Sequence, residues 1–246
     1  MLASLSSLFK KNNKFMQNYS VDLHSHLIPG IDDGSKSMNE SIELILGLKA
    51  LGFTKLITTP HIMRHRYANT SEIILSRLDD VREELKRQEI DIELEAASEY
   101  YLDEHLLELI NKRDILTFGE NYLLFEMSYT LKPLNLESVI YEMKVAGYQP
   151  VLAHPERYFF MHEDFSIYKR LKEQGLLFQV NLNSFGGYYS KPVQKVAHAL
   201  MEKGWIDFLG SDTHKSSHLE HFRKNLNSKI LKKIFEKNTI LNNQLI

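Results

Sequence analysis

The chain has 246 residues, of which 43% are hydrophobic and 25% charged, which is the composition of an ordinary globular protein. Its formal net charge of −2 provides no overall field that would attract nucleic acid or an anionic membrane surface. The absence of cysteine excludes disulfides, thiolate zinc sites and a cysteine nucleophile. No run approaches the roughly 18 apolar residues that are needed to span a bilayer.

Residues 1–18 differ in kind from the rest of the chain. Leu2, Leu5 and Leu8 recur at helical spacing, and three lysines follow them. A secretory signal would carry its positive charge before a longer apolar segment, so we expect no export and a cytoplasmic protein. We predict that residues 1–18 form a leader, as a short amphipathic helix or a disordered segment, with at most a peripheral membrane contact. Residues 19–246 are predicted to form one domain.

From residue 19 onward, short apolar runs alternate with patterns of helical spacing. The predicted strands are 19–23, 53–59, 92–97, 122–125, 150–153, 176–182 and 205–209. Helices are predicted near 37–52, 70–88, 104–111, 136–147, 167–175, 192–204 and 219–235. This order is typical of repeated βα units. Because the strands are mostly continuous apolar runs, we expect parallel strands that are buried on both faces, in a single α/β domain.

The motif Asp22-Leu23-His24-Ser25-His26 ends the first predicted strand. Residues i and i+2 of a strand point to the same face, so His24 and His26 are expected to project side by side. Neutral imidazole is a good ligand for zinc, manganese or iron. Two histidines at this spacing also occur by chance in many chains, so the motif alone leaves open an ordinary pair of polar residues.

Metal-binding side chains recur at the carboxyl ends of the later predicted strands. With the first pair, the set is His24, His26, His61, Glu99, Glu126, His154, Asp212 and His214. In a closed parallel barrel such ends face one mouth. Each residue alone has an ordinary alternative; Asp212, for example, could cap a helix. Carboxylates that end apolar strands would nevertheless cost several kcal/mol if they were buried without partners. A cluster of two or three divalent ions explains the whole set better.

These motifs resemble those of the PHP (polymerase and histidinol phosphatase) superfamily. A closer resemblance is to the manganese-dependent tyrosine-protein phosphatases of bacterial capsule and exopolysaccharide operons. The segments that carry it are His24-Ser25-His26, Asp32-Asp33-Gly34, Ser98-Glu99-Tyr100-Tyr101, Ala153-His154-Pro155-Glu156-Arg157-Tyr158 and Ser211-Asp212-Thr213-His214.

The resemblance implies a fold, a cofactor and roles for residues. The fold would be a distorted (β/α)7 TIM-like barrel in a single domain, with up to three divalent ions. These ions would be manganese, with iron or zinc as alternatives, and the eight residues above would be their ligands. Arg157 would bind the phosphate. Asp33 would lie near the ions and would be a candidate for proton handling.

The resemblance also implies an activity. A water made acidic by the ions would attack phosphotyrosine as hydroxide, on a protein such as the tyrosine-rich tail of a bacterial kinase that regulates capsule or exopolysaccharide synthesis. No nucleic acid partner is expected. The alternative is a small-molecule phosphoesterase of the same superfamily, such as a histidinol-phosphate phosphatase. Several aromatic residues near strand ends could pack on a phenyl ring: Tyr100, Tyr101, Tyr129, Tyr158, Phe159, Phe160, Tyr188 and Tyr189.

One segment departs from the family pattern. Family members commonly follow the last Asp-x-His with an Asn and then an Arg-Pro stretch, whereas Lys215 comes next here and the first following arginine is Arg223. Lys215, Arg64 or Arg66 could supply the second cation instead, and Lys215 is predicted to contact the substrate. The remaining histidines are expected to be surface or packing residues: His105, His162, His198, His218 and His221.

Overall fold

The computed structural model describes residues 19–225 and 228–245, so the predicted leader lies outside the described part of the chain. The strands form two sheets in which every pairing is parallel. The first sheet has the order β1 (Val21–Asp22), β2 (Lys55–Thr58) and β4 (Glu93–Ala96). The second has the order β3 (His61–Ile62), β5 (Glu99–Tyr101), β6 (Tyr122–Glu126), β7 (Gln149–Ala153), β8 (Leu177–Asn181) and β9 (Phe208–Gly210).

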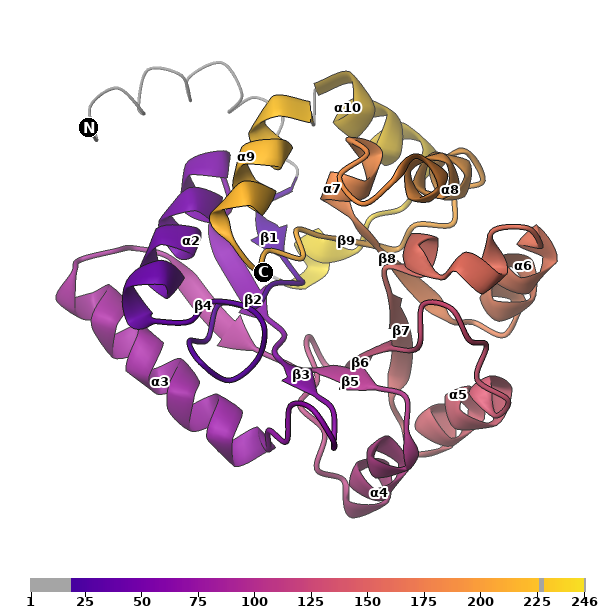
Figure 1. Cartoon of the computed structure of the whole chain (residues 1–246), viewed down its shortest axis with the longest axis horizontal. Helices are drawn as coiled ribbons and strands as arrows, with labels where there is room; N and C mark the ends of the chain where they lie inside the picture. The colour runs from indigo at the N-terminus through magenta and orange to yellow at the C-terminus, as the bar shows by residue number, and fades with distance from the viewer. Residues whose placement is uncertain (1–18, 226–227, 246) are drawn as a thin grey trace.

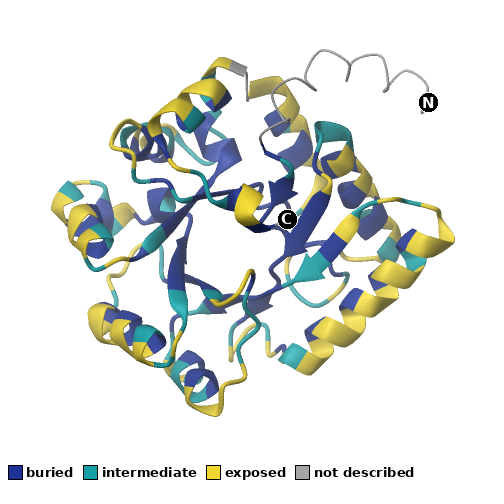
Figure 2. Ribbon diagram, turned by 180° about the vertical axis from the view of Figure 1, so that it is seen from behind, coloured by how far each residue is buried: buried dark blue, intermediate teal, exposed yellow. Residues whose placement is uncertain are grey.

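The helices lie around the outside of the strands (Figure 1). They are α2 (Met38–Leu51), α3 (Ser71–Arg87), α4 (Glu104–Lys112), α5 (Leu136–Val145), α6 (Phe165–Glu173), α7 (Leu182–Phe185), α8 (Lys191–Glu202), α9 (Ser216–Asn225) and α10 (Ser228–Lys237). The described residues also form three short 3-10 helices: η3 (Pro155–Arg157), η4 (Phe159–Met161) and η5 (Asn242–Leu245). Most of the strands are buried, whereas β4 is partly exposed, and the outer faces of the helices are exposed (Figure 2). The expected α/β domain with parallel strands is confirmed.

Two predicted strands each continue, after a break, into a second short strand. β2 is followed by β3, and β4 is followed by β5. At each of these breaks the chain passes from the first sheet to the second. His61 and Glu99 therefore begin strands, and the prediction that they end strands was wrong. Pro60 lies in the first break, where it has no N–H to donate to a ladder. His61 and Glu99 pair in register across β3 and β5, so the breaks still bring them together.

The two sheets also meet near the first and last strands. Ser25 forms a parallel bridge with Thr213. The Asp212 N–H donates to the His24 carbonyl at 2.7 Å, and the His26 N–H donates to the Thr213 carbonyl at 3.0 Å. The segment that follows β1 and the segment that follows β9 therefore lie side by side.

Two apolar clusters fill the fold. The larger one joins the strands to the surrounding helices. The smaller one joins strands of both sheets, and its members include Val21, Ile57, Leu124, Val151 and Phe208. The inner faces of the two sheets therefore pack on one another, and polar side chains at the carboxyl ends of the strands lie beyond an apolar interior.

Helix ends follow from local chemistry. The Ser37 hydroxyl accepts from the Glu40 N–H at 3.3 Å, as the predicted capping pattern requires. Gly52 ends α2 with φ 108°, a conformation that suits glycine. In place of the single predicted helix 219–235, the structure describes α9 and α10, on either side of residues 226–227, which lie outside the described ranges. No helix in the described ranges has both the length and the apolar character to cross a membrane.

Candidate metal centre

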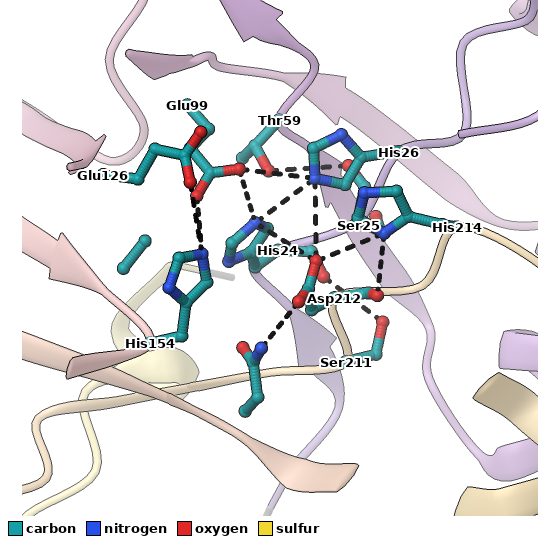
Figure 3. A network of polar contacts seen from close by, with 12 residues as sticks. His24, Ser25, His26, Thr59, Glu99, Glu126, His154, Ser211, Asp212 and His214 are labelled. Atoms are coloured by element: carbon teal, nitrogen blue, oxygen red, sulfur yellow. Dashed lines mark hydrogen bonds and ion pairs between the residues drawn. The ribbon is translucent and has the colours of Figure 1, made fainter. Parts of the chain in front are cut away.

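The eight predicted ligands lie together, six of them at or just beyond the carboxyl ends of strands and two, His61 and Glu99, at the starts of β3 and β5. Seven of these side chains are drawn in Figure 3, where they point toward one another. A cleft of about 600 Å³ opens onto the cluster, and His61, Glu99, Glu126, His154, Asp212 and His214 line it. His24 and His26 lie deeper and are completely buried.

Two hydrogen bonds orient the histidines of the first motif. The Nδ1 atom of His24 lies 2.7 Å from the Oε1 atom of Gln179, an amide oxygen that can only accept. The Nδ1 atom of His26 lies 2.8 Å from the Oδ2 atom of Asp32. Both Nδ1 atoms therefore donate, and both Nε2 atoms are left with a lone pair. The two Nε2 atoms lie 3.3 Å apart. Outer contacts of this kind fix the ring orientation of histidines that bind metals.

Glu99 lies at the centre of the histidines. Its Oε2 atom is 3.1 Å from His24 Nε2, 3.4 Å from His26 Nε2 and 3.3 Å from His61 Nδ1. Its Oε1 atom is 2.9 Å from His154 Nε2. One buried carboxylate thus faces four imidazoles, which is the arrangement expected of a bridging ligand.

Glu126 and Asp33 extend the cluster on the side of His61. The Oε1 atom of Glu126 lies 3.3 Å from His61 Nδ1. The Oδ1 atom of Asp33 lies 3.5 Å from His61 Nε2 and 3.4 Å from His214 Nε2. Glu126 is buried, whereas the Asp33 side chain is 45% exposed. Asp33 therefore reaches both the cluster and the solvent.

The two carboxylate oxygens of Asp212 face different groups: Oδ2 accepts hydrogen bonds from supporting side chains, and Oδ1 faces the predicted histidine ligands. Its Oδ2 atom accepts from Asn181 Nδ2 at 2.6 Å, from the Tyr189 hydroxyl at 2.9 Å and from Arg157 Nη1 at 3.0 Å. Its Oδ1 atom faces Nε2 of His24 and of His26, both at 3.7 Å, and Nδ1 of His214 at 3.3 Å.

The backbone is strained at two of the predicted ligands. Asp212 has φ 50° and His154 has φ 35°, both in the left-handed region that residues other than glycine rarely adopt. His154 also precedes Pro155, which disfavours helical conformations at the residue before it. Strain of this kind persists only where surrounding contacts impose it, and it is often found at functional sites.

The donor set fits divalent metal ions. Four groups of side chains have one potential ligand atom each within 4.8 Å of one another. They are His26 with Asp33, His61 and His214; His24 with Glu99 and His154; His24 with His26 and Asp212; and His61 with Glu99 and Glu126. The buried Nδ1 atom of His61 has no hydrogen-bond partner, although it faces two carboxylates. Imidazole nitrogen and carboxylate oxygen are ligands for manganese, iron and zinc.

The pKa shifts of the predicted ligands also indicate that the buried carboxylates of the cluster favour a nearby positive charge. Burial lowers the pKa of His24, but the charges of Glu99 and Asp212 outweigh burial and raise it to about 9. The pKa of His61 is raised to about 10, because Glu99 and other acceptors again outweigh burial. Burial, followed by the charge of Glu99, raises the pKa of Glu126 to about 7. These three groups therefore hold protons more tightly than free side chains do, whereas burial lowers the pKa of His154 to about 4.

Arg157 and Lys215, the predicted substrate-binding residues, both line the cleft. Of the other cations that were considered, Arg66 lines the cleft as well. Arg64 instead forms an ion pair with Glu108, at 2.9 Å. Of the aromatic candidates, Tyr101, Tyr129, Tyr188 and Tyr189 line the cleft.

Sequence reasoning overlooked the residues that hold the ligands in place. Gln179 and Asn181 share one face of β8, and a pair of polar residues in an apolar strand was an available signal. His218, expected at the surface or in packing, is buried, and its Nδ1 atom donates to the Asp212 carbonyl at 2.8 Å. No spacing in the sequence indicates that contact.

Comparison with known proteins assigns the family. The family model for capsular polysaccharide synthesis proteins CpsB/CapC matches residues 20–244. The chain belongs to the CpsB/CapC family. CapC of Staphylococcus aureus is 28% identical over 218 residues, which cover 88% of this chain and 86% of CapC. The tyrosine-protein phosphatase YwqE of Bacillus subtilis is 28% identical over 195 residues, which cover 79% of this chain and 77% of YwqE.

A solved structure supports the fold of this CpsB/CapC member. It comes from a study of YwqE of Bacillus subtilis and CpsB of Streptococcus pneumoniae, described there as metal-dependent tyrosine phosphatases. The TM-score is 0.77 at 24% identity, and the match covers 89% of this chain and 96% of the other. The tyrosine-protein phosphatase CpsB of Streptococcus pneumoniae is 27% identical in sequence, over 79% of this chain and 82% of CpsB.

Proposed function

We propose that this protein hydrolyses phosphotyrosine on proteins in a metal-dependent reaction. Family membership supports this function, as do the names of the relatives YwqE and CpsB. The observation that carries it is the convergence of imidazole and carboxylate ligands beside Arg157, in a cleft that also exposes aromatic rings. A hydrolase of this design needs no nucleophilic cysteine, and the chain has none.

The eight predicted ligands would hold the ions. His24 and His26 would bind through Nε2 and Asp212 through Oδ1, because their other polar atoms are already engaged. Glu99, which faces His24 with one oxygen and His154 with the other, would bind metal together with these histidines. Divalent ions, manganese first and iron or zinc as alternatives, would supply a water of lowered pKa and withdraw charge from the phosphoryl group.

Arg157 would bind the phosphoryl oxygens. Its guanidinium carries five N–H donors, and among the described residues only Asp212 accepts one of them. The other donors remain for a phosphate, which guanidinium binds in a bidentate manner. Asp33, which is half-exposed and lies between His61 and His214, would accept a proton from the attacking water. Lys215 would add a second positive charge at the rim.

The rest of the molecule fits this role. We propose that the two sheets are parts of one distorted (β/α)7 barrel, in a single domain over residues 19–246, and the bridge between Ser25 and Thr213 supports this closure. The protein would act in the cytoplasm, on the phosphorylated tail of a bacterial tyrosine kinase that regulates capsule or exopolysaccharide synthesis. The leader, residues 1–18, would at most touch a membrane surface.

A substrate panel tests the proposal. Protein stripped with a chelator would be resupplied with manganese and given a phosphotyrosine peptide, a phosphoserine peptide and histidinol phosphate. We expect metal-dependent turnover that favours phosphotyrosine and is lost in His154→Ala and Arg157→Ala. Arg77→Ala, on the exposed face of α3, serves as the control. Preference for histidinol phosphate would instead indicate a small-molecule phosphoesterase, and no turnover of any substrate would refute the enzyme assignment.

A further inference from the structure

The Arg157 guanidinium contacts two tyrosine rings. Its Cζ atom lies 4.5 Å from the ring centroid of Tyr129 and 4.4 Å from that of Tyr189. Tyr129 follows β6, Arg157 follows β7 and Tyr189 lies in the connection after β8. These three strands are neighbours in the sheet, in that order. The guanidinium therefore contacts one tyrosine ring from the segment that follows each of the two strands beside β7.

Each of these tyrosines also bonds to a carboxylate of the metal cluster. The Tyr129 hydroxyl donates to Glu126 Oε2 at 3.3 Å. The Tyr189 hydroxyl donates to Asp212 Oδ2 at 2.9 Å. The same side chain thus contacts the phosphate-binding cation through its ring and a predicted metal ligand through its hydroxyl.

We propose that Tyr129 and Tyr189 are positioning residues that hold Arg157 in a fixed place relative to the metal ligands. A ring stabilises a guanidinium without using its N–H donors, whereas a second carboxylate would occupy them. The donors of Arg157 then stay available to a phosphoryl group. This inference rests on the proposed function in that a phosphate is the ligand.

Packing is the ordinary alternative for both rings. Tyr129 stacks on Tyr158 with centroids 5.8 Å apart, and Tyr189 meets Tyr188 edge-on at 5.2 Å. A ring that only packs would affect stability, and any effect on phosphate binding would not depend on Arg157. A ring that positions Arg157 has an effect on phosphate binding that disappears when Arg157 is absent.

A double-mutant cycle on the full-length protein separates these roles. Binding of manganese, and then of inorganic phosphate to the manganese-loaded protein, would be measured by calorimetry. The variants are Tyr189→Phe and Tyr189→Leu, the same pair at Tyr129, and each Leu variant combined with Arg157→Ala. Tyr141→Leu is the matched control, because Tyr141 lies on α5 with 65% of its side chain exposed.

We expect the Leu variants to weaken phosphate binding about tenfold when Arg157 is present and less than about twofold when it is absent. The Phe variants keep the ring, so they should retain phosphate binding but weaken manganese binding by about tenfold. Equal losses in both backgrounds, or no loss at all, would overturn the inference. If the variants behave as expected but the wild-type protein does not hydrolyse phosphotyrosine, the positioning role stands and the proposed function fails.

Discussion

Gln179 accepts the Nδ1 proton of His24 across 2.7 Å, and this bond joins β8 to the segment after β1, 155 residues away in the sequence. It selects the tautomer of His24 that leaves Nε2 free for a metal. We expect Gln179→Met, which keeps the side-chain length but removes the acceptor, to weaken manganese binding by about tenfold or more. Calorimetric titration measures this, with Gln149→Met at the start of β7 as the control. Unchanged affinity would show that His24 needs no such partner.

Removing the metal should lower the stability of the protein. A ligand present at 100 times its dissociation constant stabilises the native state by about 2.7 kcal/mol. We therefore expect manganese to raise the melting temperature of chelator-treated protein by about 6 °C or more. Differential scanning calorimetry with and without manganese measures the shift. The shift should shrink in His154→Ala, and an equal shift in that variant would argue against His154 as a ligand.

Asp22 should support folding without holding metal. It is completely buried, and its carboxylate accepts from the Ser211 N–H and from the Ser211 hydroxyl, each at 2.7 Å. Asp22→Ala leaves both donors without that partner, and we expect a loss of about 3 kcal/mol in the free energy of unfolding. Urea denaturation in the presence of chelator tests this. Asp79→Ala on α3, whose partner Arg82 is exposed, should cost less than about 1 kcal/mol.

Gly210 should be required by the site for steric reasons. A Cβ atom there would lie 2.5 Å from His24 Cβ and 2.7 Å from Gln179 Nε2. Gly210→Ala is therefore expected to displace His24 and to weaken manganese binding by at least about tenfold. Gly147→Ala is the informative control, because its Cβ meets nothing within 4 Å while its φ of 93° is unfavourable for alanine. It should cost about 1 kcal/mol of stability and leave manganese affinity unchanged.

The basic residues near the cleft, Lys215, Arg66 and Arg64, should differ in their effect on substrate binding. Lys215 and Arg66 line the cleft, whereas Arg64 is held by Glu108. Lys215→Ala and Arg66→Ala should each raise the KM for a phosphotyrosine peptide about threefold at low salt, with less effect at high salt. Arg64→Ala should leave KM unchanged. Steady-state kinetics at two salt concentrations test this, and a larger effect at Arg64 than at Lys215 would contradict it.

Much of this arrangement followed from periodicity and strand order. Alternation along a strand predicted that His24 and His26 lie side by side, which holds although β1 ends at Asp22 and only the bridge at Ser25 follows it. Parallel order was enough to bring His154 and Asp212 to the same end. The structure places all eight predicted ligands together, and their role in binding metal stays a prediction. The breaks that make His61 and Glu99 begin new strands were missed, because an apolar run does not reveal where a chain changes sheets.

The supporting contacts were harder to foresee. Tyr129 and Tyr189 were considered as surfaces for a phenyl ring, but their contact with Arg157 depends on three loop conformations that no spacing encodes. Gln179 and Asn181 were the exception, since two polar residues on one face of an apolar strand carry a readable signal.

The meeting of the first and last strands has a consequence for biosynthesis. Asp22 and Ser211 are 189 positions apart, and His24 and Asp212 are similarly distant. A nascent chain therefore carries His24 and His26 long before Asp212, one of their carboxylate neighbours, has been synthesised. Contacts of such high sequence separation form slowly, because the loop between them must close first. If these residues hold metal as proposed, we expect a chain truncated before Asp212 to bind it more weakly than the full-length protein.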